Sequence, residues 1–131
     1  MKKIRLLDSF AILAYLKKEN NYLRVKELLS TPGIPVLMND INVGETYYIL
    51  AKDRGREQAD TFLTVMLPSL PIVVRSNLFE HVIEASWIKA NHALSFADCF
   101  AVATALRESA IIVTGDPEFK AVQNIVEIEW L

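Results

Sequence analysis

The pattern that decides the fold lies in residues 111–119, IIVTGDPEF. Residues 111–114 are all β-branched, which is typical of a strand. Aspartate followed by proline then predicts a short helical turn, because aspartate caps helices and proline is favoured at the first helical position. A strand without alternating polar residues predicts a sheet that is covered on both faces.

Similar runs at residues 4–7, 35–38, 71–74 and 125–130 predict four more strands. Helical segments alternate with them. We expect helices over residues 10–18, 22–29, 41–52 and 59–67, a fifth from a Ser76 cap to about residue 90, and a sixth in residues 94–107, with Ser95 as its cap. This alternation predicts a three-layer α/β/α domain, with a central parallel sheet of about five strands. We expect residues 1–131 to form a single domain.

Composition narrows the functional class only slightly. Of the 131 residues, 52% are hydrophobic, yet no apolar run reaches the roughly 18 residues that cross a bilayer, so we expect no membrane association. Arg5 and Asp8 interrupt the apolar N-terminal stretch and no cleavage site follows, which argues against a signal peptide. A single cysteine allows no internal disulfide and suits the cytoplasm. The net charge of −2 does not exclude a nucleic-acid partner, because acids gathered at one metal site would leave a basic remainder.

Four acids fall where such a sheet binds ligands. Asp8 directly follows the first predicted strand, and Asp116 follows the fourth. Asp98 lies in the first turn of a helix, and Glu45 lies about a turn deeper in another. Ligands bind at the carboxyl ends of parallel strands, so these acids are candidates for one site. Each has a structural alternative, since Asp8 and Asp116 suit helix caps, Asp98 suits a capping box with Ser95, and Glu45 suits a solvated helix face.

The neighbours of these acids favour metal binding. Asp98 precedes the apolar run Cys99-Phe-Ala-Val-Ala, and Glu45 lies between Val43-Gly44 and Tyr47-Tyr48-Ile49-Leu50. Buried carboxylates are costly and repel one another, and a divalent cation removes that cost. Carboxylate ligands without histidine or cysteine favour Mg²⁺ or Mn²⁺ over zinc.

Other reactive residues have simpler interpretations. His81 and His92 lack the spacing of metal ligands and suit surface or packing positions. Cys99 points about 100° away from Asp98 on a helix, so we interpret it as a small core residue. The sequence contains neither a glycine-rich phosphate loop nor a G-x-S-x-G elbow.

Four segments, in this order and at these intervals, carry a resemblance to a known family. They are LLDSFAILAYL, INVGETYYILAK, LSFADCFAVATALR and IIVTGDPEFKAV. Together they resemble PIN-domain nucleases, particularly the VapC-type toxins of bacterial and archaeal toxin–antitoxin pairs. The resemblance spans nearly the whole chain. Asn42 and Gly44, before Glu45, depart from the commonest pattern of the family and suit one of its subgroups.

The resemblance implies specific roles. Asp8, Glu45, Asp98 and Asp116 match the acids that hold Mg²⁺ or Mn²⁺ in this family, with Glu45 as a ligand or as the group that orients the attacking water. Ser9 matches the hydroxyl residue after the first acid. Thr114 matches the supporting hydroxyl residue two positions before the last acid. The resemblance also implies an endoribonuclease that dimerises and is inhibited by a co-encoded antitoxin protein.

The expected substrate is RNA in a single strand or loop, since phosphodiesters there can enter a cleft. Lys52, Arg54 and Arg56 form the densest basic group, in a predicted loop after the Glu45 helix. They suit contacts to the phosphate backbone, and equally a solvated helix end whose dipole favours cations.

Two other functional classes remain open from the sequence. The first is a phosphatase-type hydrolase with Asp8 as its nucleophile, although such enzymes typically have D-x-D and this chain has Asp8-Ser9-Phe10. The second is a non-catalytic PIN-like module that binds a partner, against which the presence of all four acids argues.

Overall fold

The computed structural model describes residues 3–131. The elements, in chain order, are β1 (Arg5–Leu7), α1 (Ser9–Leu16), α2 (Tyr22–Ser30), β2 (Val36–Asn39), α3 (Asp40–Arg54), α4 (Arg56–Thr61), the π-helix η1 (Phe62–Met66), α5 (Leu67–Ser69), β3 (Ile72–Arg75), α6 (Phe79–Asn91), α7 (Phe96–Glu108), β4 (Ile111–Thr114), the 3₁₀-helix η2 (Pro117–Val122) and β5 (Ile128–Trp130).

The five strands form one sheet in the order β3-β2-β1-β4-β5, and every neighbouring pair is parallel. The chain builds outward from β1 to β3 and then returns to β4 on the other side of β1. The sheet therefore has a topological switch point between β1 and β4, the place at which open α/β sheets typically bind ligands, at the carboxyl ends of the strands.

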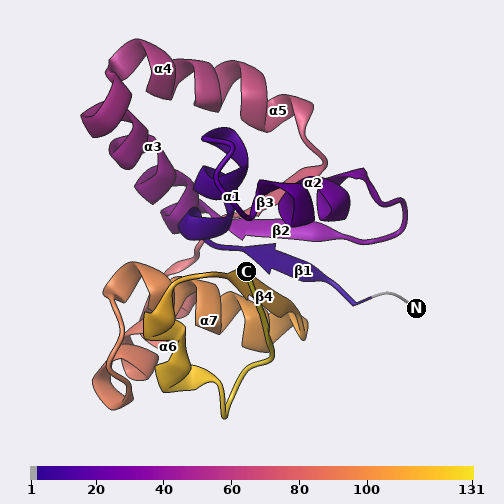
Figure 1. The fold of residues 1–131 in the computed structure, drawn as a ribbon. Helices are drawn as coiled ribbons and strands as arrows, with labels where there is room; N and C mark the ends of the chain where they lie inside the picture. Colours follow the sequence, from indigo (N-terminus) through magenta and orange to yellow (C-terminus); the bar gives the residue numbers. More distant parts are fainter. Residues whose placement is uncertain (1–2) are drawn as a thin grey trace.

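Two helical layers enclose the sheet, with α1–α5 on one face and α6 and α7 on the other (Figure 1). Adjacent strand residues face opposite layers, because side chains alternate along a strand. Leu6, Leu37 and Ile112 belong to the core shared with α6 and α7, whereas Leu7, Met38 and Val113 belong to the core on the side of α1. The predicted three-layer architecture and parallel sheet are confirmed.

Three local predictions were wrong. Ser76 does not cap α6, whose N-cap is Leu78, and residues 125–127 precede β5 rather than belonging to it. The segment predicted as one regular helix over residues 59–67 includes the π-helix η1, so Leu63 and Met66 are exposed although α-periodicity places them inward. A π-turn holds an additional residue, which rotates the side chains relative to an α-helix.

None of the helices in residues 3–131 combines the length and apolarity needed to cross a membrane.

Candidate metal centre

Asp8 links the end of β1 to the start of α1. Its Oδ1 accepts a hydrogen bond from the Ala11 N–H at 2.9 Å and so caps α1, while Oδ2 accepts one from Thr114 Oγ1 at 2.5 Å. The side chain is buried. One oxygen of this carboxylate therefore caps α1, and the other bonds to Thr114 at the end of β4.

Thr114 is the last residue of β4, the strand next to β1. Its hydroxyl donates to Asp8 and accepts from the Asp116 N–H at 3.0 Å, and it is fully buried. Asp116 Oδ1 in turn accepts from the Glu118 N–H at 2.9 Å, which caps η2. One hydroxyl thus fixes both the Asp8 carboxylate and the backbone that carries Asp116.

Asp98 enters the site from the first turn of α7. The Ser95 hydroxyl accepts from the Asp98 N–H at 3.3 Å, as the predicted cap requires. The Asp98 side chain is buried. The cap therefore holds the helix end that presents this carboxylate.

Glu45 lies in α3, the helix that follows β2. Its Oε1 is buried and has no hydrogen-bond partner within residues 3–131, and the same holds for Oδ1 of Asn42 one turn earlier. Asn42 Nδ2 donates to the Ala97 carbonyl at 3.2 Å, which ties α3 to the first turn of α7. Unpartnered buried oxygens are rare in folded proteins, so this corner suits a cation or ordered water.

The acids converge from separate parts of the chain. Carboxylate oxygens of Asp98, Asp116 and Glu118 lie within 4.8 Å of one another. The negative charges of Asp98 and Asp116 interact with Asp8, and those of Glu45 and Asp116 interact with Asp98. All four predicted acids thus contribute to one negative region.

Glu118 is a member of this group that our sequence analysis missed. It is exposed and lies two residues after Asp116, in the first turn of η2. The signal that could have found it is the acid–proline–acid spacing, because the tight 3₁₀ turn keeps both acids at the same end of β4.

Burial changes the protonation of the two most enclosed acids. It raises the pKa of Asp8 to about 7, and the charges of Asp98 and Asp116 add to this, while hydrogen bonds from Thr114 and Ala11 oppose it. Burial likewise raises the pKa of Asp98 to about 7, opposed by a hydrogen bond from Ser95 and reinforced by Glu45, Asp116 and Glu118. A carboxylate cluster of this kind favours a divalent cation, which neutralises the repulsion.

The remaining candidates lie outside the cluster. Ser9 makes no side-chain hydrogen bond to Asp8 or to another described residue. Cys99 is fully buried in the core beside α6, and burial raises the pKa of its thiol to about 11, which agrees with a packing role. The imidazole of His81 accepts from the Leu78 N–H, and His92 is partly buried next to the end of α6.

The sequence predicted a loop for the basic group Lys52, Arg54 and Arg56, and this prediction was wrong. Lys52 and Arg54 form the last turn of α3 and Arg56 begins α4, with only Gly55 between the helices. Arg56 Nε lies 3.7 Å from Asp60 Oδ2, within ion-pair distance. Lys52 is seven residues after Glu45, about 10 Å along the helix axis, so the group lies away from the acids.

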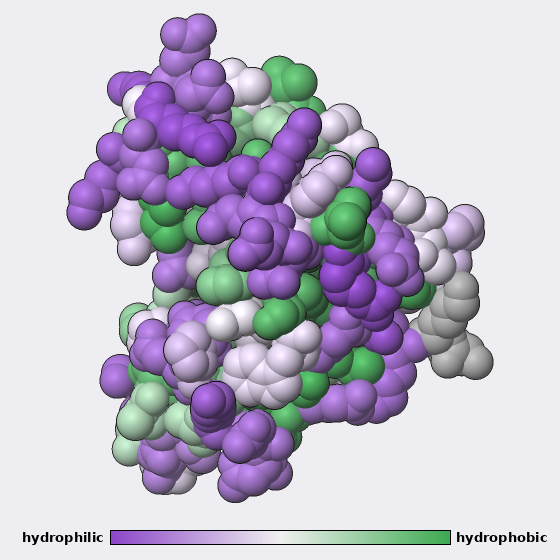
Figure 2. Space-filling view, in the orientation of Figure 1, coloured by the Kyte–Doolittle hydropathy of each residue, from purple (hydrophilic) through white to green (hydrophobic). Residues whose placement is uncertain are grey.

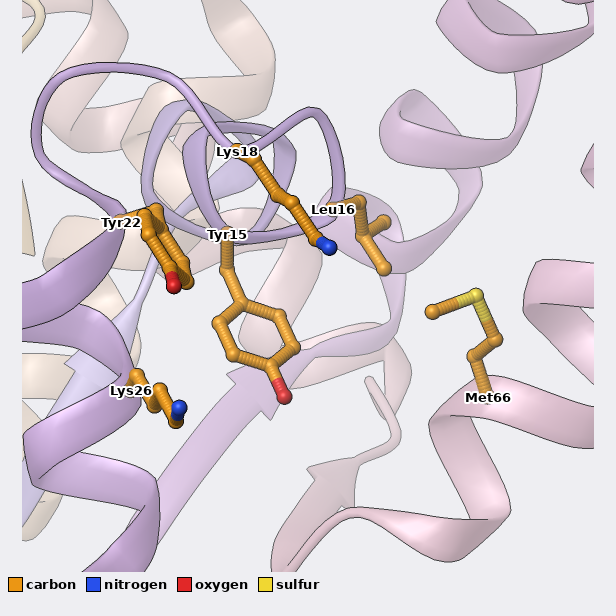
Figure 3. Close-up of a pocket in the computed structure, with 6 residues that line it drawn as sticks. All are labelled: Tyr15, Leu16, Lys18, Tyr22, Lys26 and Met66. Atoms are coloured by element: carbon orange, nitrogen blue, oxygen red, sulfur yellow. The ribbon is translucent and has the colours of Figure 1, made fainter.

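Asp8 and Asp116 follow the carboxyl ends of β1 and β4. In the space-filling view, the outline recedes between the two helical layers, on the side to which the β1 and β2 arrows point (Figures 1 and 2). A separate cavity of about 220 Å³ is lined by Tyr15, Leu16, Lys18, Tyr22, Lys26 and Met66, and none of the acids contributes to it (Figure 3).

Comparisons with solved structures support the fold. VapC20 of Mycobacterium tuberculosis, described as a sarcin–ricin loop cleaving toxin, has a TM-score of 0.76 at 18% identity, covering 90% of this chain and 94% of its own. VapBC2 of Rickettsia felis, bound to a DNA fragment from its promoter, has a TM-score of 0.76 at 19% identity, covering 98% of each chain. FitAcB of Neisseria gonorrhoeae has a TM-score of 0.66 at 22% identity, covering 95% of each chain.

A comparison with curated proteins finds no match. A family model described as "PIN domain" matches residues 5–125, which include every strand except β5 and all five acids of the cluster. The chain belongs to the PIN domain family.

Proposed function

We propose that this protein is a Mg²⁺- or Mn²⁺-dependent endoribonuclease that hydrolyses RNA phosphodiester bonds, and that it is the toxin of a toxin–antitoxin pair. The observation that carries the proposal is the gathering of Asp8, Asp98, Asp116 and Glu118 at the switch point of a PIN fold, with Glu45 beside Asp98. The donors are all carboxylate oxygens, which suits a hard cation.

Asp8, Asp98 and Asp116 would hold the cation, directly or through water, and Glu118 would join them. Such a cation lowers the pKa of an attacking water and neutralises charge on the phosphoryl oxygens. Glu45 would bind the cation or orient the water, and its unpartnered Oε1 is available for either task. Thr114 would keep Asp8 in one orientation through its hydroxyl. Ser9 remains a proposed supporting residue through its position beside Asp8, although its hydroxyl bonds none of the acids.

The alternative of a phosphatase with Asp8 as nucleophile has weaker support. Such enzymes typically have D-x-D after the first strand, whereas Asp8 is followed by Ser9 and Phe10. A purely partner-binding module would not require a group of acids in which burial, reinforced by neighbouring negative charges, raises the pKa of Asp8 and Asp98.

The toxin role draws on solved structures that resemble this chain, which include one described as a toxin and one described as a toxin–antitoxin complex. The cavity of Figure 3 suits an antitoxin segment with acidic and apolar side chains, because it combines Lys18 and Lys26 with Tyr15, Tyr22 and Met66. Tyr15 lies between the α2 side chains and Met66 in this view. The buried thiol and an RNA substrate suit the reducing cytoplasm.

We also propose a homodimer. Phe79, Ile83 and Trp87 follow one another at i, i+4 and i+8 along α6, and all three are exposed. Ile83 and Trp87 border an apolar hollow shared with Leu106 of α7. Exposed apolar patches of this kind mark interfaces, and most oligomers are symmetric pairs of one chain.

The decisive experiment is cleavage of RNA by purified protein with Mg²⁺, with Mn²⁺ and with excess EDTA. We expect cleavage with either cation, none in EDTA, and none by an Asp8→Asn variant that melts as a folded protein. Full cleavage in EDTA would exclude the metal mechanism. A phosphorylated Asp8 trapped during hydrolysis of a small phosphate ester would instead favour the phosphatase.

Lys52→Ala/Arg54→Ala/Arg56→Ala tests the proposed contact of the basic group with RNA. If these residues bind the phosphate backbone, the variant weakens RNA binding more at low salt than at high salt. Unchanged RNA binding at both salt concentrations would leave them as a solvated helix end.

A further inference from the structure

We propose that the hollow beside Phe10 is a nucleobase-binding subsite, in which one base of a single-stranded RNA stacks on Phe10 next to the acid cluster. This rests on the proposed function and assigns a substrate contact to that same site. The hollow has a volume of about 370 Å³ and is lined by Phe10, Ala14, Glu19, Asn20 and Asn21. Volumes of roughly 300–1,000 Å³ are typical of small-ligand sites.

The Phe10 ring lies against the backbone that joins two groups of the site. A Cβ at Gly115 would be 2.3 Å from Phe10 Cε1 and 2.6 Å from Cζ, so the ring packs directly on this glycine. Gly115 lies between Thr114, which bonds Asp8, and Asp116. The ring therefore contacts the residue that precedes Asp116 in the sequence. A side chain at position 115 would displace the ring.

Phe10 is nevertheless 39% exposed, unlike the rest of the buried start of α1. An exposed aromatic ring that is held against backbone is a rigid platform, and single-stranded nucleic acids bind by stacking bases on such rings. Ala14 lies one turn further along the same face of α1 and is small, which leaves room above the helix.

Asn20 and Asn21, which also line the hollow, carry groups that suit the edge of a base. The side-chain amides of Asn20 and Asn21 make no hydrogen bond within the part of the chain that the structure describes. Asn21 occupies the N-cap position of α2 without using its side chain as a cap. Each amide offers both a donor and an acceptor, the combination that base edges require.

Among residues 3–131, those that line the hollow include no lysine or arginine and one acid, Glu19. Its chemistry therefore does not suit a phosphate. An uncharged, flat ligand with polar edges fits its lining, whereas the neighbouring phosphate would lie towards the acid cluster and its cation. A nucleobase attached to that phosphate meets both conditions.

The test is fluorescence anisotropy in Ca²⁺ with two labelled probes of equal length. One is a single-stranded RNA of eight nucleotides, and the other is a chain of tetrahydrofuran spacers that has the phosphates but no bases. Ca²⁺ accepts the same oxygen ligands as Mg²⁺. We expect wild-type protein to prefer the RNA.

Phe10→Leu should weaken RNA binding by roughly 5- to 150-fold, as expected for a lost stack, and leave binding of the spacer chain unchanged. Phe10→Tyr, which keeps the ring, should retain the preference.

Gly115→Ala should weaken RNA binding in the wild-type protein and have little further effect in Phe10→Leu, because its Cβ acts by moving the ring. Asn20→Ala/Asn21→Ala should change the ratio of oligo(A) to oligo(U) binding, with the exposed Asn124→Ala as matched control.

The outcomes separate the two levels of proposal. If wild-type protein binds and cleaves RNA but Phe10→Leu binds it equally well, or if the spacer chain binds as tightly as RNA, the subsite is wrong and the ribonuclease stands. If wild-type protein neither binds nor cleaves any RNA, the proposed function itself fails. Melting curves of each variant establish that the fold is intact.

Discussion

At the scale of single residues, the Thr114 hydroxyl connects two of the acids. It bonds the carboxylate of Asp8, which lies 106 positions earlier in the sequence, and the backbone N–H of Asp116. Both of its hydrogen bonds are buried or partly buried. Orientation of a metal-binding carboxylate by such a neighbour typically changes metal affinity or activity by about 10–100-fold.

Replacing Thr114 tests this role. Thr114→Val keeps the shape of the side chain and removes the hydroxyl, so we expect RNA cleavage to fall by about 10–100-fold and to require more Mn²⁺. Thr114→Ser should recover most of the activity, because it restores the donor. Equal Mn²⁺ dependence in wild type and Thr114→Val would contradict the role.

The acids also predict how stability depends on pH without metal. Asp8 and Asp98 have pKa values of about 7 in the folded protein, against 3.8 for an ordinary aspartate. Between about pH 4 and pH 7 the folded state therefore binds more protons than the unfolded state, and rising pH lowers the free energy of unfolding. Below pH 4 both states are protonated, and above pH 7 the loss is complete.

We expect the Tm in EDTA to be higher at pH 5 than at pH 8. Asp8→Asn should raise the Tm at pH 8, since asparagine still caps a helix and carries no charge. Mg²⁺ or Mn²⁺ should raise the wild-type Tm at pH 8 and do so less in Asp8→Asn. A Tm in EDTA that rises from pH 5 to pH 8 would contradict this.

At the scale of elements, α7 combines packing with presentation of a ligand. Residues 99–105 are all buried, and most are small, so the helix packs closely against the sheet. Its N-terminus carries the Ser95 cap and Asp98, and its C-terminus ends at Ser109 in the left-handed conformation, with φ at 53°. An L-residue is strained there, and glycine is the usual choice.

Ser109→Gly should therefore stabilise the protein. We expect a gain of about 0.5–1 kcal/mol in the free energy of unfolding, measured in urea, with Ser109→Ala giving no gain. RNA cleavage should not change, because Ser109 is eleven residues from Asp98, about 16 Å along the helix. A loss of stability in the glycine variant would show that the Ser109 side chain has a stabilising contact.

At the scale of the whole molecule, the sheet order explains why the acids meet. β1 and β4 are neighbours with aligned carboxyl ends, while β2 leads into the helix that carries Glu45. The same arrangement leaves α6 on the outside of its layer, with Phe79, Ile83 and Trp87 exposed. The surface that we propose for self-association is thus formed by α6, and the acids belong to the sheet edge.

Trp87→Asp tests the proposed dimer. A buried unpaired charge opposes association, so we expect a monomer where wild-type protein is a dimer, by light scattering over a range of concentrations. Leu23→Asp, at another exposed apolar residue on α2, is the matched control and should remain dimeric. A monomeric wild-type protein, or a dimeric Trp87→Asp, would contradict the assignment.

Much of the fold was predictable because its signals are local. The β-branched runs such as residues 111–114, the Ser95 cap and the Asp116-Pro117 turn each act over a few residues, and the structure has all of them. Helix η1 was not predictable, since one additional residue in a turn leaves no mark in an apolar pattern. The predicted start of α6 was also wrong, because Ser76 is a common capping residue and the helix begins two residues later, with Leu78 at the N-cap.

The sequence by itself determined which residues end strands and begin helices, and so placed Asp8, Glu45, Asp98 and Asp116 near one edge of a parallel sheet. Periodicity and capping are sufficient for this because they depend on neighbours in the chain. Only the tertiary structure decided that Thr114 bonds Asp8, that Glu118 joins the acids, and that Phe10 lies on Gly115. These contacts depend on strand order and on the packing of segments far apart in sequence, which no local pattern contains.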